Sequence, residues 1–222
     1  MILIEEGYKY LRCNLNESRY IHTLGVVSVA KKLARINGVC EEKAEIAALS
    51  HDIAKNIKVK RMKEILDQNN IVLNECENKT PELWHSIIAP IVAKEVFKIN
   101  DKEILSAIRW HTTGRPKMTK LEKIIYIADM IEPSRSFNGI EDIRKETLQD
   151  LDKGVILGLT HTLRYLLSKN QLVDINTINA RNYLLIQAKE NISCNVGRQI
   201  WIEKEDNRSL LEGKKEEGHQ KK

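Results

Sequence analysis

Four of the six histidines in this 222-residue chain sit in an apolar, helix-like context. Around each one, apolar residues recur at the three- and four-residue spacing of a single helix face, so each imidazole is expected to point inward from its own helix. A single buried histidine is more often a hydrogen-bonded packing residue. Four converging imidazoles instead predict a metal site, because neutral imidazole is a common metal ligand. The four are His22, His51, His85 and His111.

Two aspartates share this setting. Asp52 directly follows His51 and lies one turn above Ala48, and Asp129 lies one turn above Ile125. Asp52 alone would serve as a cap or an ion-pair partner. A carboxylate facing an apolar interior is costly unless a positive charge compensates it, and no lysine or arginine stands in register on either helix. A shared divalent cation would compensate all six groups. Imidazole and carboxylate without thiolate favour iron, manganese or another six-coordinate ion over a structural zinc. Open positions for water and substrate would make the site catalytic.

Cations adjoin the same motifs. Arg19 lies three residues before His22, and Lys55 ends a His-Asp-x-x-Lys pattern. Two more cations follow the polar turns after the later motifs. Any one of them alone would be a solvated surface charge. Grouped around a metal site, they indicate an anionic, multiply charged substrate such as a phosphate ester or anhydride. The later two are Arg115 and Arg135.

The overall composition excludes several classes of protein. With 36 basic and 31 acidic residues, the net charge of +5 fits a protein that handles anions. Only 5% of residues are aromatic, and the sequence has no basic stripe with interleaved aromatics, so nucleic-acid binding is not expected. The sequence also has no apolar run long enough for a membrane span and no secretory signal pattern. The four scattered cysteines form no CxxC pair, so we expect reduced thiols in a cytoplasmic protein.

Helical periodicity dominates the chain and no alternating strand pattern occurs, so the predicted fold class is all-α. A single domain is expected over residues 1–190. Residues 191–222 are expected to form a charged, flexible tail, because residues 203–222 are almost devoid of apolar side chains. The predicted helices cover residues 3–13, 16 or 18 to 36, 41–54, 59–69, 81–97 with Thr80 as cap, 101–111, 120–131 with a Thr119–Glu122 capping box, 140–168 as one helix or two weakened by Gly154 and Gly158, and 177–191.

The order of the six ligand-type residues resembles that of the HD-domain metal phosphohydrolases. More narrowly, residues 51–55 (HDIAK), 108–115 (IRWHTTGR) and 121–135 (LEKIIYIADMIEPSR) resemble the YqeK family, which comprises bacterial symmetrical diadenosine tetraphosphate hydrolases. The resemblance spans residues 8–189. It implies a single HD-domain helical bundle with the metal site in its interior cleft. It also implies metal-dependent hydrolysis of dinucleoside tetraphosphates to two nucleoside diphosphates (ADP).

The resemblance also implies roles for individual residues. An iron ion, with Mn²⁺ or Co²⁺ as alternatives, would be held by His22, His51, Asp52 and Asp129. His85 and His111 would lie on the open side and meet phosphate or a second metal. Residues 172–177 would close over base and sugar. The expected catalytic residues are Asp52, His85, His111 and Lys55. The expected substrate-binding residues are Arg19, His22, Lys55, His85, His111, Thr112, Asp129 and Arg135.

Other functions remain as alternatives. A different HD nucleotide phosphohydrolase would use the same centre, but the alarmone enzymes carry an acidic pair soon after the His-Asp doublet, and residues 53–56 contain none. The cyclic-dinucleotide class needs a Gly-Tyr-Pro tripeptide, which is absent. A non-catalytic nucleotide sensor would bind without turnover, although the intact ligand set argues against it. The expected partner is a small-molecule nucleotide, and leucines on exposed faces of the later helices would allow a homodimer.

Overall fold

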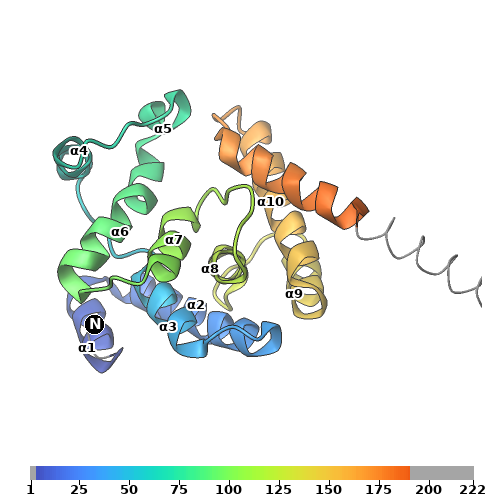
Figure 1. Cartoon of the computed structure of the whole chain (residues 1–222), viewed down its shortest axis with the longest axis horizontal. Helices are drawn as coiled ribbons and strands as arrows, with labels where there is room; N and C mark the ends of the chain where they lie inside the picture. Colours follow the sequence, from blue (N-terminus) through green and yellow to red (C-terminus); the bar gives the residue numbers. More distant parts are fainter. Residues whose placement is uncertain (1–3, 191–222) are drawn as a thin grey trace, which may run out of the picture. The chain divides into compact units, whose positions relative to one another are not determined.

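The structure is a computed structural model that describes residues 4–190. Within this range the secondary structure is helical and contains no strand, which confirms the all-α fold class (Figure 1). A further helical segment covers residues 175–190. No described helix is long and apolar enough to cross a membrane. The elements are α1 (Ile4–Asn14), α2 (Glu17–Asn37), α3 (Glu41–Ser50), α4 (Val59–Gln68), α5 (Glu75–Lys79), the 3₁₀ turn η1 (Pro81–Leu83), α6 (Trp84–Phe97), α7 (Lys102–Trp110), α8 (Lys120–Ile131), α9 (Ile140–Gln149) and α10 (Leu151–Ser168).

The chain divides into two compact units, Met1–Asn182 and Tyr183–Lys222. Every residue predicted to do chemistry belongs to the first unit. The tail predicted at residues 191–222 lies outside the described residues.

Helix α8 forms the centre of the first unit. It packs against α2, α3, α7 and α10, and Figure 1 shows it end-on between α7 and α10. It is apolar on almost every side, and Ile124, Ile125 and Ile127 are fully buried, as a helix enclosed by others requires. Thr119 and Glu122 form the predicted capping box at its start. Asp129, near its other end, is therefore held by a helix that is enclosed by other helices of the bundle.

Helix α3 ends at Ser50, four residues before the predicted end of the 41–54 helix. The Nδ1–H of His51 donates a 2.6 Å hydrogen bond to the carbonyl of Ala48. That carbonyl is the acceptor the Asp52 amide would use in a continuing helix. The chain instead makes three-residue turns, such as the 2.9 Å bond from the Lys55 amide to the Asp52 carbonyl. The His-Asp pair thus lies at a helix end rather than on a helix face.

Other boundaries differ from the prediction for local reasons. The 81–97 segment begins as a 3₁₀ turn, and the Thr80 side chain makes no capping bond. The short helix α5, with an Asn74–Glu77 capping box, was not predicted because five residues carry no hydrophobic period. The 140–168 segment is two helices, because extended Asp150 caps α10 through the amides of residues 152 and 153. Gly158 lies inside α10, where a Cβ would stand 2.8 Å from Cδ1 of Ile127. This glycine therefore permits close packing of α10 on α8.

Candidate metal centre

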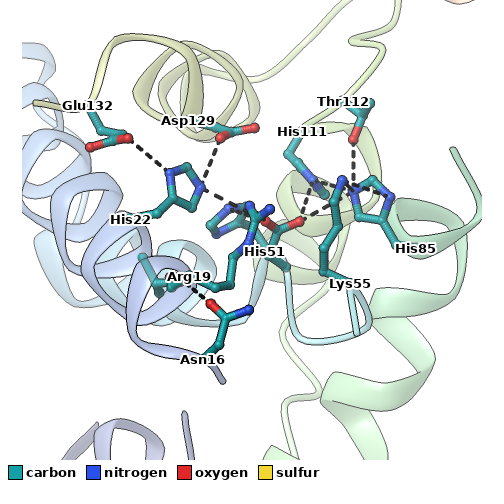
Figure 2. A network of polar contacts seen from close by, with 12 residues as sticks. Asn16, Arg19, His22, His51, Lys55, His85, His111, Thr112, Asp129 and Glu132 are labelled. Carbon is teal, nitrogen blue, oxygen red and sulfur yellow. Dashed lines mark hydrogen bonds and ion pairs between the residues drawn. The ribbon is translucent and has the colours of Figure 1, made fainter. Parts of the chain in front are cut away.

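The six predicted ligand-type residues converge at one place in the first unit (Figure 2). Their ligand atoms form two groups, and within each group these atoms lie within 4.8 Å of one another. One group contains His22 from α2, His51 from the end of α3 and Asp129 from α8. The other contains Asp52 from the turn after α3, His85 from α6 and His111 from the end of α7.

Asp52 connects the two groups. Its Oδ2 lies 3.5 Å from Nε2 of His51 and 3.9 Å from Nε2 of His22. Its Oδ1 lies 3.3 Å from Nε2 of His85 and 3.6 Å from Nε2 of His111. The side chain is only 5% exposed. One carboxylate thus faces all four imidazoles, each oxygen toward a different pair.

Each imidazole is oriented through its other nitrogen. In three of the four, Nδ1–H donates to the carbonyl three residues earlier in the chain. These bonds join His51 to Ala48 (2.6 Å), His85 to Glu82 (2.7 Å) and His111 to Ile108 (2.7 Å). Such bonds fix the tautomer and leave the Nε2 lone pair available for a metal ion.

His22 is oriented from a distant part of the chain. Its Nδ1 lies 3.0 Å from Oε1 of Glu132, a carboxylate 110 residues further on. A neutral His22 that donates its Nδ1–H to Glu132 has no proton on Nε2, and this Nε2 lies 3.1 Å from Oδ1 of Asp129. Two acceptor atoms this close need a cation between them, either a proton or a metal ion.

The lone pairs left over test whether the residues fit a metal ion. Among the described residues, the buried Nε2 atoms of His22 and His51 have no hydrogen-bond partner. Nε2 of His85 and Nε2 of His111 face each other at 3.2 Å. Unpartnered buried nitrogens are costly, and a cation is the group that satisfies several converging lone pairs. The donor set therefore fits a divalent metal ion.

The charge states agree with this fit. Burial raises the pKa of Asp52, but His51 and His111 outweigh it and hold that pKa well below its ordinary value. Burial also opposes ionisation of Asp129, yet the adjacent His22 and the nearby His51 lower its pKa strongly. Burial, with His111 and Lys55, lowers the pKa of His85 to about 3. At neutral pH the centre therefore offers ionised carboxylates and an uncharged His85.

The cations lie where the motifs predict, but they do more than face solvent. Nη1 of Arg19 lies 2.7 Å from Oδ2 of Asp52, and Nη2 of Arg135 lies 2.7 Å from Oδ1 of Asp129. The inference that only a metal ion could compensate these carboxylates, drawn because no cation stands in register on either helix, was therefore wrong. It considered only each aspartate's own helix, whereas Arg19 comes from α2 and Arg135 from the segment after α8. The case for a metal ion thus rests on the unpartnered nitrogens and not on uncompensated charge.

The remaining predicted contacts lie on the His85 side. Nζ of Lys55 lies 3.3 Å from Nε2 of His85, and Oγ1 of Thr112 lies 3.4 Å from the same nitrogen (Figure 2). Arg115 lies apart from the centre and instead bonds Glu122 at 2.8 Å. Thus the centre includes three of the four flanking cations.

Sequence reasoning missed Glu132. This carboxylate is 1% exposed and accepts bonds from His22 and from the amide and hydroxyl of Ser134. Space for it exists because residue 25 on α2 is glycine, where a Cβ would lie 2.5 Å from Oε2 of Glu132. The available signal was an acidic residue at the C-terminal end of a helix, where the helix dipole disfavours it, three residues after Asp129.

Replacing Glu132 with glutamine should weaken metal binding by about tenfold or more, because outer hydrogen-bond partners of metal-binding histidines carry effects of this size. Glutamine keeps the shape but loses the charge that strengthens the bond from His22. Metal titration of the metal-free protein measures the change. Glu64→Gln is the matched control, because Glu64 is a partly exposed carboxylate on α4 that pairs with Arg61. Equal affinities in the wild type and Glu132→Gln would show that Glu132 does not support the ligand.

Comparison with known proteins gives the family. The HD domain family model matches residues 19–134. The chain is 40% identical over 181 residues to the symmetrical bis(5′-nucleosyl)-tetraphosphatase of Bacillus subtilis (strain 168). The aligned region covers 82% of this chain and 97% of that protein. It is 41% identical to the protein of the same name from Halalkalibacterium halodurans, covering 83% and 98%. The chain belongs to the YqeK family of HD-domain proteins.

A solved structure supports the same family. The crystal structure of an HD superfamily hydrolase from Clostridium acetobutylicum, described as involved in NAD metabolism, superposes with a TM-score of 0.81 at 41% identity. It covers 84% of this chain and 99% of its own. The HD-domain match includes all six converging residues and Glu132, and Arg135 lies just beyond it. The HD domain and the His/Asp cluster together suggest divalent-metal binding.

Proposed function

We propose that this protein is a metal-dependent hydrolase that cleaves diadenosine tetraphosphate symmetrically into two molecules of ADP. The observation that carries the proposal is the centre around Asp52. Four oriented imidazoles and two carboxylates meet there, flanked by Arg19, Lys55 and Arg135. Its relatives named symmetrical tetraphosphatases, matched over nearly their whole length, supply the substrate.

The metal would be held by His22, His51, Asp52 and Asp129. We propose iron, with Mn²⁺ or Co²⁺ as alternatives that suit imidazole and carboxylate ligands. A second ion would use His85 and His111 with the other oxygen of Asp52, a set whose atoms already lie close together. When bound, a divalent ion polarises a phosphoryl oxygen and lowers the pKa of water.

The chain's own cations would bind the polyphosphate from several sides. Arg19 uses Nη1 to bind Asp52, and Arg135 uses Nη2 and Nε to bind Asp129. The two side chains are 28% and 43% exposed, so further N–H groups remain for phosphate oxygens. Lys55 adds a third positive charge on the His85 side. Charge that develops on the transferring phosphoryl group and on the departing diphosphate would be stabilised by these groups.

His85 would act as a neutral group at this site, beside His111. With His85 uncharged at neutral pH and its Nδ1–H bonded to a backbone carbonyl, its Nε2 accepts a proton or binds a cation. The Thr112 hydroxyl beside it can donate to a phosphate oxygen. We assign His85 to the half of the substrate on the Lys55 side. The predicted homodimer stays a proposal, supported by exposed Leu157 and Leu167 on α10.

The products of one reaction test the proposal. Metal-loaded protein is incubated with diadenosine tetraphosphate, and the nucleotides are separated by anion-exchange chromatography. We expect ADP as the sole product, at two molecules per substrate consumed. AMP with ATP would refute symmetrical cleavage. Bound metal and bound nucleotide without turnover would refute the hydrolase and favour a sensor.

A further inference from the structure

A cavity of about 250 Å³ opens beside the metal centre, between α8, α10 and the segment that joins α8 to α9. His111 and Asp129 line its inner end, so it is continuous with the site where phosphate would react. Phe137, His161 and Thr162 also line it. None of these three residues has a role in the centre described above.

The cavity lining includes two aromatic rings that contact each other. The ring centroids of Phe137 and His161 lie 4.1 Å apart, and the ring planes are inclined by 31°. Burial and the nearby Arg164 lower the pKa of His161, so its ring is uncharged at neutral pH. Both rings are partly exposed. Flat aromatic surfaces of this kind stack with nucleobases without selecting one base.

The cavity contains groups that match the separate parts of a nucleotide. Arg135 lies beside the metal centre, because its guanidinium is bonded to Asp129, and it is partly open to solvent. The aromatic pair and the hydroxyl of Thr162 are further parts of the lining. A phosphate near Arg135 would therefore place its nucleoside against rings and a hydrogen-bonding hydroxyl.

A substrate that yields two nucleoside diphosphates carries a nucleoside at each end, and both must lie outside the metal centre. We propose that this cavity is the subsite for the second of these nucleosides, with its base on the Phe137–His161 pair and its nearest phosphates at Arg135. The inference rests on the proposed function. It assigns Phe137 and His161 to binding the half of the substrate that extends past Asp129, away from Lys55.

The test compares two substrates that differ only in that nucleoside. Diadenosine tetraphosphate carries adenosine at both ends, and adenosine 5′-tetraphosphate carries it at one. In Phe137→Ala, we expect kcat/KM for the first to fall by about tenfold, within the range for one base–aromatic stack, while kcat/KM for the second stays unchanged. The ratio of the two constants is the readout. His161→Ala should lower this ratio in the same way, and His161→Phe, which keeps a ring, should restore it.

Controls separate the subsite from damage to the fold or the centre. Tyr165→Ala removes a ring from α10 that is 53% exposed and outside the cavity, and it should leave the ratio unchanged. Metal content and melting temperature are measured for every variant. An unchanged ratio in Phe137→Ala, whether both constants fall together or neither does, would overturn the proposal. Absence of ADP production by the wild type would instead overturn the proposed function.

Discussion

Replacing Asp52 with asparagine should abolish turnover, lowering kcat/KM by at least about 10³-fold, and should release most of the bound metal. Within residues 4–190, Asp52 alone faces all four imidazoles, and its two oxygens face different pairs of them. Asparagine preserves the shape but removes the charge, and its amide nitrogen is not a lone-pair donor. It also leaves Arg19, 2.7 Å away, without its ionised partner.

Metal analysis and steady-state kinetics on purified Asp52→Asn check this expectation. Asp67→Asn is the matched control, because Asp67 is an exposed carboxylate on α4 that pairs only with Lys63, also on α4, at 2.6 Å. The control should keep wild-type metal content and rate. If Asp52→Asn kept both as well, the centre described here would not be the catalytic one.

Removing the metal with a chelator should cost a similar factor in rate and should also lower the melting temperature. Asp52 and the five groups around it would lose the cation that satisfies their lone pairs, and a metal ion binds them only when the fold has brought them together. At free metal a thousandfold above its Kd, the linkage is about 4 kcal/mol. In a domain of this size that corresponds to roughly 8–16 °C in Tm.

Adding back Fe²⁺, Mn²⁺ or Co²⁺ should restore activity, and Ca²⁺, which prefers oxygen ligands, should not. Binding should weaken as pH falls. Burial alone would lower the pKa of His22, but Asp129 and Glu132 outweigh it and raise that pKa above its ordinary 6.5. Metal must therefore displace a proton from His22 below this raised pKa, and its affinity should fall by about tenfold per pH unit there. Scanning calorimetry and metal titration at several pH values measure both effects. Full activity after exhaustive chelation would refute a metal-dependent reaction.

Periodicity identified the residues of the centre, but not how they are held. The spacing of apolar residues around His22 and His85 reports which side of a helix is buried, and both do lie on helices. His51 and His111 lie at helix ends, because each ring bonds a carbonyl that a longer helix would have used. A pattern of side-chain types contains no information on that competition.

The sequence also did not show which contacts form outside the helices. Arg135 follows α8 closely, yet its bond to Asp129 depends on how the chain turns after Pro133. Glu132 belongs to the centre only because α8 packs on α2 at Gly25. The family resemblance implied a ligand set, whereas periodicity did not. A family motif reflects the folded arrangement of its residues, but periodicity reports only which side of a helix is buried.

The four imidazoles differ in the stage of folding at which each can be oriented for metal binding. Three are aimed by a carbonyl three residues away, so a short stretch of chain suffices to orient each of them. His22 depends on Glu132, which reaches it only after α8 has docked on α2. A nascent or partly unfolded chain would therefore offer an incompletely oriented ligand set that binds an ion weakly. Tight metal binding would then be the last step of maturation, and molecules that have not finished folding would be inactive.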